Sequence, residues 1–166
     1  MLVLKGSAAK LPPGELDKMS ISKKLKYYRF VQAFNQLNDY VAKQPANYST
    51  VEETIQKVGQ YQWTIESDLT DSYFQRHMSP TKWPWMCFVS PFKGVYVMKR
   101  TAQGFINSAE GLTELVGGVL GHLAAQGKCV YHADNLWTGG DTIEEATANW
   151  KLVLEALQNN NLFGSF

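Results

Sequence analysis

Apolar positions recur at helical spacing in two long stretches of the chain. In residues 108–127 they form a stripe that predicts a helix opening at Ser108 and ending at Gly127. The members of this stripe are Leu112, Leu115, Val116, Val119, Leu120 and Leu123. The capping-box pattern of Thr142 and Glu145 predicts the start of a last helix. The inward positions of that helix are Trp150, Val153, Leu154 and Leu157.

Between these stretches, β-branched and aromatic residues gather between turn residues, which predicts strands. We expect a strand over residues 63–69, a hairpin over 83–100 that turns at 91–94, and a second hairpin over 129–138. Shorter predicted elements are a strand over 28–37, a helix after the capping box of Thr50 and Glu53 with Val51, Ile55 and Val58 on one face, and a helical turn over 71–77. Strands and helices alternate, so the predicted fold class is α+β, with helices packed on an antiparallel sheet.

The 166 residues are one domain's length, and their apolar content of 45% is enough for a hydrophobic core. Residues 1–28 lack strong periodicity and contain Pro12-Pro13-Gly14, so we expect a basic, partly ordered arm before a domain over 29–166. No apolar run reaches the roughly 20 residues that cross a bilayer, and the first residues are too short an apolar stretch for a signal peptide. We therefore expect no membrane partner.

Charge is distributed unevenly along the chain. The first 30 residues carry seven Lys or Arg against two acids, whereas the residues after Arg100 carry two Lys against seven acids. A basic first part favours phosphate binding and an acidic last part favours cations, although solvated lysines near a terminus explain the first pattern equally well. Cys87 and Cys129 have no metal-ligand spacing and predict two buried, reduced thiols in an intracellular protein.

Two acids stand at predicted strand ends. Asp68 closes the strand over 63–69, and Asp134 lies at the tip of the second hairpin. Carboxylates that converge can bind Mg²⁺, which prefers hard oxygen ligands, and a pair of such ions supports phosphoryl transfer. From the residues alone the alternative is that both acids are ordinary turn residues.

Four segments, in order, resemble the fingers and palm of retroviral and retrotransposon reverse transcriptases, over about residues 29–157. They are the segment from Arg29 to Asn38, the segment Ser67-Asp68-Leu69-Thr70-Asp71-Ser72-Tyr73-Phe74, the segment Thr101-Ala102-Gln103-Gly104-Phe105-Ile106-Asn107-Ser108, and the segment His132-Ala133-Asp134-Asn135-Leu136-Trp137. The last one lies where the family has Tyr-x-Asp-Asp. The resemblance implies a palm-like sheet with a partial fingers hairpin, in a retroelement RNA-directed DNA polymerase of the cytoplasm or of a retroelement particle.

The resemblance also implies a role for each matching residue. Asp68 and Asp134 would bind Mg²⁺ or Mn²⁺ as the catalytic carboxylates. Arg29 would pair with the triphosphate of a deoxynucleotide, because its planar fork suits phosphate oxygens. Gln103 would contact the incoming nucleotide, and Tyr73 would lie under its sugar and exclude a 2′-hydroxyl. From the residues alone, Arg29 could equally be an exposed surface charge, Gln103 a polar residue before a helix, and Tyr73 an aromatic residue of the core.

The sequence departs from the family's pattern at the metal site. Asn135 stands where the second Asp of the hairpin belongs, so we expect a weakly bound metal and an active site with weak or no activity. His132 replaces a Tyr and Ala102 a Pro, which are milder changes. The family's further triphosphate-binding Lys has no clean counterpart, because its spacing falls on Ser22, beside Lys23 and Lys24.

The sequence stops at Phe166, where the family continues into another palm strand, a thumb and often an RNase H domain. We therefore expect an RNA or DNA primer–template to be held poorly, and an open sheet edge through which copies of the chain could associate. Two further interpretations stay open: a repurposed, non-catalytic nucleic-acid-binding or scaffold protein with the palm fold, and an unrelated α+β domain with accidental matches.

Overall fold

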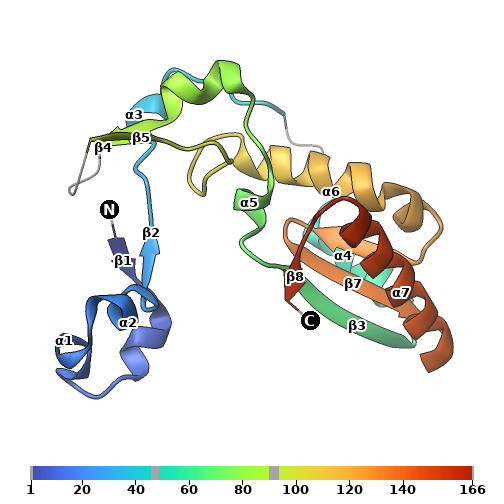
Figure 1. The fold of residues 1–166 in the computed structure, drawn as a ribbon. Helices are drawn as coiled ribbons and strands as arrows, with labels where there is room; N and C mark the ends of the chain where they lie inside the picture. The colour runs from blue at the N-terminus through green and yellow to red at the C-terminus, as the bar shows by residue number, and fades with distance from the viewer. Residues whose placement is uncertain (1, 46–48, 90–93, 166) are drawn as a thin grey trace.

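The computed structural model describes residues 2–45, 49–89 and 94–165, and it has the predicted α+β architecture. In Figure 1 a small N-terminal lobe and a larger domain built on an antiparallel sheet lie at opposite ends of the chain, joined by extended segments. Side chains of Ile21, Leu25, Arg29, Phe30 and residues 1–4 lie outside the described part.

The N-terminal lobe contains five short elements. They are β1 (Leu2–Leu4), the 3₁₀ helix η1 (Gly6–Lys10), α1 (Glu15–Lys18), α2 (Ile21–Leu25) and β2 (Tyr28–Phe30). Strands β1 and β2 pair antiparallel, so the lobe closes on itself. The partly ordered arm expected over 1–28 thus contains several short elements, and β1 gains a partner in β2 that local sequence does not reveal. The predicted strand over 28–37 ends early, at Phe30, and α3 (Asn35–Asn38) follows it.

The middle of the chain carries one strand of the central sheet and a separate two-stranded hairpin. Its elements are α4 (Val51–Val58), β3 (Trp63–Leu69), α5 (Ser72–Gln75), η2 (Pro80–Met86), β4 (Cys87–Val89) and β5 (Val95–Val97). Strand β3 has the predicted bounds. The predicted hairpin is β4 paired with β5, and most of its predicted turn, residues 90–93, lies outside the described residues.

The last part of the chain completes the larger domain. Its elements are α6 (Ser108–Ala125), β6 (Cys129–His132), β7 (Asn135–Gly140), α7 (Ile143–Asn159) and β8 (Gly164–Ser165). These confirm both long helices and the second hairpin. The N-cap of α6 is Asn107, one residue before the predicted cap, because the Ser108 hydroxyl donates to the Ala102 carbonyl instead (2.7 Å). Thr142 caps α7 as predicted, accepting from the Glu145 N–H (3.1 Å).

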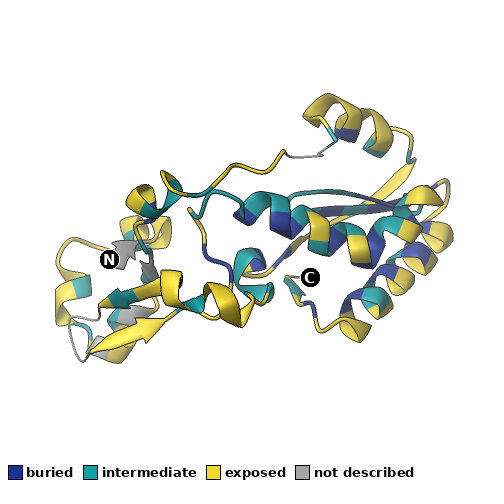
Figure 2. Cartoon of the chain, turned by 90° about the horizontal axis from the view of Figure 1, so that it is seen from above, coloured by how far each residue is buried: buried dark blue, intermediate teal, exposed yellow. Residues whose placement is uncertain are grey.

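The central sheet has the strand order β6-β7-β3-β8, with every neighbouring pair antiparallel. Helices α6 and α7 cover one face, and their apolar stripes meet Leu69, Leu136 and Cys129 of the sheet in the main core. Figure 2 shows the buried residues gathered on these helices and strands. Val153 and Leu157 are buried as predicted, whereas Trp150 and Leu154 are only half-buried.

Two predictions about the outer elements were wrong. In α4 the apolar residues Val51 and Ile55 are 56% and 64% exposed, while Thr54 is buried and Val58 half-buried, so the helix packs through another face than the predicted one. Cys87 is exposed, since its strand belongs to the two-stranded hairpin rather than the core; Cys129 is buried as predicted, and both thiols are free.

The expected open edge of the palm sheet is partly occupied. Strand β8 pairs with β3 at Asp68 and Leu69, so the C-terminal residues supply a short piece of the neighbouring strand. Gln75 fixes this arrangement, since its side chain donates to the Phe163 carbonyl (2.6 Å) and accepts from the Phe163 N–H (2.7 Å). The sequence analysis missed β8 because two residues give no periodic signal.

Candidate active site

The backbone segments that carry Asp68 and Asp134 lie next to each other at one end of the sheet. The register of β3 and β7 places Asp68 directly opposite Asn135. The neighbouring residues Leu69 and Leu136 are buried against the helices, and side chains alternate along a strand, so Asp68 and Asn135 lie together on the other face. On that face the Asp68 side chain is exposed.

Asp134 lies beside this pair in a two-residue turn between β6 and β7. His132 pairs with Asn135 across the turn, and Ala133 adopts a positive φ of 54°. The Leu69 N–H donates to the Asp134 carbonyl (2.8 Å), which ties the turn to the end of β3. The tight turn and the register together bring residues 68, 134 and 135 to one place, although 66 residues separate the first two in sequence.

Tyr73 lies on the helix side of this site. It packs against the main core from α5, and burial raises its pKa above the usual 10.0, with further increases from the negative charges of Asp134 and Glu110. The phenol is therefore close to both carboxylates. Glu110, in the first turn of α6, was missed by the sequence analysis; its Oε2 atom is buried without a hydrogen-bond partner. The only sequence signal was an acid two residues after Ser108.

Gln103 is exposed in a loop that Asn38 holds in place. The Asn38 side chain donates to the Gly104 carbonyl (3.0 Å) and accepts from the Ile106 N–H (3.0 Å). Gly104 has a φ of +90°, a value that favours glycine. Asn107 continues the clamp: its side chain accepts from the Gln44 N–H and donates to the Ala42 carbonyl, both at 3.0 Å. The positioning roles of Asn38 and Asn107 were not recognised from the sequence, because each depends on contacts more than 60 residues apart.

The basic residues of the N-terminal lobe lie apart from the carboxylates. Lys23 is exposed and Lys24 half-buried on α2, which Figure 1 shows at the far end of the molecule from β3 and β7. Arg29 is on β2, opposite Val3, and its side chain lies outside the described residues. The structure therefore does not bring these three residues together with Asp68, and their phosphate-binding roles stay predictions.

The charge at the sheet end is low for a metal centre. Within the described ranges, no group of three or more His, Cys, Asp or Glu side chains is arranged to hold a metal ion. Asp68 and Asp134 supply two carboxylates, while Asn135 supplies an amide oxygen without charge. Mg²⁺ can use such oxygens together with water, so the residues present fit one weakly held ion.

The arrangement of the sheet and its helices matches solved structures of reverse transcriptases. The prototype foamy virus protease-reverse transcriptase, as a mutant, superposes with a TM-score of 0.73 at 18% identity, covering 83% of this chain and 18% of that chain. The chain has a reverse transcriptase-like fold. A foamy viral protease-reverse transcriptase with an RNA/DNA hybrid gives a TM-score of 0.73, and one with double-stranded DNA gives 0.65, both at 18% identity over 83% of this chain.

The chain spans about a fifth of the length of these proteins, 18% to 23%. No protein-family model matches the sequence, and the comparison with curated proteins gives no match either. At 18% identity the likeness shows the fold alone. None of the helices in the described ranges has the length and apolar character that a bilayer crossing requires.

Proposed function

We propose that this chain is the fingers-and-palm part of a retroelement RNA-directed DNA polymerase whose metal site is weakened. The observation that carries the proposal is the register that sets Asp68 beside Asn135 and the Asp134 turn. The fold likeness supports it, since the matched proteins are reverse transcriptases and two of them hold DNA or an RNA/DNA hybrid. By this analogy the partners are a primer–template and deoxynucleotides.

In this proposal Asp68 and Asp134 hold Mg²⁺ or Mn²⁺, which when bound would activate a primer hydroxyl and neutralise the triphosphate. Gln103 contacts the incoming nucleotide from the loop that Asn38 clamps. Tyr73 supports the sugar from α5, where it packs against the main core. Arg29, Lys23 and Lys24 of the N-terminal lobe bind phosphate groups of the nucleic acid or nucleotide.

The missing charge at Asn135 sets the expected activity. Two unit charges ~4 Å apart at an effective dielectric near 20 interact by about 4 kcal/mol, an upper bound for the loss of one carboxylate. Half of that loss weakens metal binding more than tenfold at equilibrium, because about 1.4 kcal/mol is a factor of ten. We therefore expect weak or absent primer extension.

The second candidate function is a non-catalytic protein that binds nucleic acid through the same fold. Two observations favour it: the neutral Asn135 in the site, and the exposed lysines of the N-terminal lobe, for which the described residues show no ion pair. This function needs no metal, so it predicts nucleic-acid binding that is indifferent to Asn135.

Primer extension on an RNA template with Mg²⁺ or Mn²⁺ tests the first proposal. Asn135→Asp restores the lost carboxylate, and we expect it to raise the extension rate at least tenfold over the wild-type chain. The matched control is Asn135→Asp combined with Asp68→Asn, which keeps the total charge of the sheet end unchanged and should abolish the gain.

The outcomes separate the two candidates. Strong synthesis by the wild-type chain contradicts the weakened site. No gain in Asn135→Asp, together with unchanged template binding, contradicts the polymerase and leaves the binding protein.

A further inference from the structure

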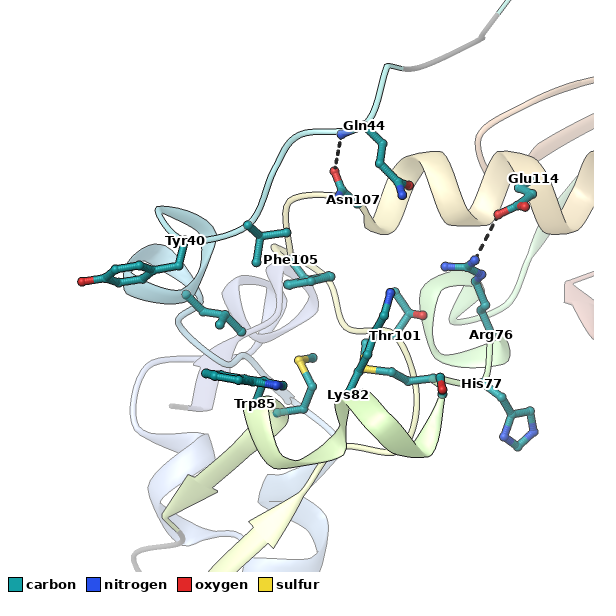
Figure 3. A pocket seen from close by; sticks show the side chains of 15 residues that line it. Tyr40, Gln44, Arg76, His77, Lys82, Trp85, Thr101, Phe105, Asn107 and Glu114 are labelled. Atoms are coloured by element: carbon teal, nitrogen blue, oxygen red, sulfur yellow. Dashed lines mark hydrogen bonds and ion pairs between the residues drawn. The ribbon is translucent and has the colours of Figure 1, made fainter.

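A cavity of about 690 Å³ lies apart from Asp68 and Asp134. It is bounded by α3 and the residues that follow it, by η2, and by the start of α6. Figure 3 shows it from close by. Asp68, Asp134, Tyr73 and Gln103 are not among the residues that line it. Its volume is within the roughly 300–1,000 Å³ of small-molecule sites in proteins.

Aromatic rings form two walls of this cavity. Trp85 of η2 and Phe105 of the loop before α6 lie on opposite sides of it in Figure 3. Trp85 is 71% exposed, while the neighbouring lining residue Met86 is 1% exposed. Exposing a large ring to water is unfavourable by about 25 cal/mol per Å² of apolar surface, so a flat ligand that covers Trp85 gains binding energy.

One cation that lines the cavity has no ion-pair partner among the described residues. Arg76 is neutralised by Glu114, with 3.1 Å between Nη2 and Oε2. Lys82 also lines the cavity, and the described part of the chain shows no ion pair for it. In Figure 3 its side chain extends from η2 into the cavity. The cavity therefore carries one uncompensated positive charge.

We propose that this cavity binds a small ligand made of an aromatic ring and one anionic group. The ring lies between Trp85 and Phe105, and the carboxylate, sulfonate or phosphate of the ligand accepts a hydrogen bond from the Lys82 ammonium. Mononucleotides and aromatic carboxylates both have this chemistry. The site does not depend on the polymerase proposal.

A ligand in this cavity also reaches the loop of Gln103. Phe105 is two residues after Gln103, and Leu37, another lining residue, is next to the Asn38 clamp. Binding would hold the walls of α3, η2 and the loop against one another. The site is thus placed to stiffen the segment that presents Gln103.

Titrations followed by ¹H–¹⁵N NMR test the proposal with four probes. They are 2-naphthoate, its uncharged counterpart 2-naphthamide, acetate as an anion without a ring, and AMP as the nucleotide source. We expect naphthoate to bind about tenfold tighter than naphthamide, since a charge-assisted hydrogen bond is worth about one factor of ten. Acetate should not bind measurably, and shifts should centre on the Trp85 indole and the Phe105 amide.

Variants separate the ring from the charge. Lys82→Met should bring naphthoate to within about twofold of naphthamide, and Lys82→Arg should keep the difference. Trp85→Ala should weaken both about tenfold and leave their ratio unchanged. The matched control is Lys151→Met at an exposed position of α7, which should leave both affinities unchanged. The NMR spectrum of each variant shows whether it folds. If Lys82→Met does not fold, Lys82→Arg and Trp85→Ala are enough to test the proposal.

Three results would overturn the proposal: equal affinities for naphthoate and naphthamide in the wild-type chain, a ratio that persists in Lys82→Met, or shifts that map outside the cavity. Binding of AMP but not naphthoate would also contradict it, because the recognised features would then extend beyond a ring and one charge.

Discussion

Single side chains in this protein take their chemistry from the face of the sheet on which they lie. Cys129 is on the helix face, where burial raises its pKa from 9.0 to about 11. Asp68 lies on β3, which is separated from the strand of Cys129 by β7. Its side chain is on the opposite face of the sheet and is exposed. One residue's difference in register would exchange these environments, because side chains alternate with a period of two.

The raised pKa of Cys129 predicts loss of stability at alkaline pH. Between about pH 9 and 11 the unfolded thiol ionises while the folded thiol keeps its proton, so the free energy of unfolding falls as pH rises. A shift of this size corresponds to about 2–3 kcal/mol. Urea unfolding at several pH values should show this fall in the wild-type chain and a smaller one in Cys129→Ala.

The control for this experiment is Cys87→Ala at the exposed position, which should keep the wild-type slope. Tyr61 and Tyr73, whose pKa values are raised mainly by burial, add to the fall above pH 10 in every variant. A Cys129→Ala slope equal to that of the wild type would contradict the assignment.

At the scale of elements, the long helices are fixed locally and the loops between them by distant contacts. Helix α6 has the predicted apolar stripe and ends at Ala125, two residues before Gly127, whose φ is +70°. The loop over 103–107 has no such local signal. Asn38 and Asn107 give it a fixed shape through hydrogen bonds to segments far away in sequence.

Two glycines of different elements predict opposite effects of the same substitution. A Cβ at Gly118 in α6 meets no atom within 4 Å, so Gly118→Ala should stabilise the fold by about 0.5–1 kcal/mol through the entropy of the unfolded chain. A Cβ at Gly139 in β7 would collide with the Tyr61 ring, so Gly139→Ala should destabilise it by about 1–3 kcal/mol.

Thermal or urea unfolding measures both effects. The Tyr61 hydroxyl also donates to the Gly127 carbonyl (2.8 Å), so Tyr61→Ala is destabilising by itself. The double variant Tyr61→Ala, Gly139→Ala no longer has the collision. It should therefore lose less stability than the sum of the losses in the two single variants. Additive losses would show that Tyr61 is not the residue in the way.

The Asn38 clamp predicts a local loss of order near Gln103. Asn38→Ala removes two hydrogen bonds and should cost about 1–2 kcal/mol of stability, with faster amide hydrogen exchange over 104–107. Asn35→Ala, in the same short helix, is the control and should leave that exchange unchanged. Equal protection of the loop in both variants would contradict the clamp.

At the scale of the whole molecule, the N-terminal lobe is rich in lysine and most acids lie in the rest of the chain. The N-terminal lobe exposes Lys5, Lys10, Lys18, Lys23 and Lys26. Figure 1 shows this lobe apart from the sheet that carries Asp68 and Asp134. Such a charge separation favours phosphate binding at the lobe, because opposing acids are distant and screened.

We therefore expect sequence-independent, salt-sensitive binding of RNA and DNA. The double variant Lys23→Gln, Lys24→Gln should weaken binding several-fold at low salt and reduce the slope of log K against log salt by about 1.5. Fluorescence anisotropy with a labelled oligonucleotide measures both. The matched control is Lys128→Gln, Lys151→Gln, which should have little effect. Binding that does not change with salt would contradict the prediction.

The sequence alone determined the long elements and the α+β class. Helices α6 and α7 and strand β3 could be predicted because periodicity and caps act over neighbouring residues. The four motif segments pointed to the palm-like fold that the solved structures share. The N-terminal lobe and β8 could not be predicted, because their strands are two or three residues long and depend on partners elsewhere in the chain.

Only the tertiary structure decided which candidate residues meet. The register of β3 and β7 places Asp68 beside Asn135 and the Asp134 turn, while α2 keeps Lys23 and Lys24 at the other end. The sequence did not predict the place of Glu110 near Tyr73, the hydrogen bonds of Asn38 to the loop of Gln103, or the cavity that Lys82 lines. Each is made by segments tens of residues apart, and such proximity depends on packing and strand pairing rather than on local pattern.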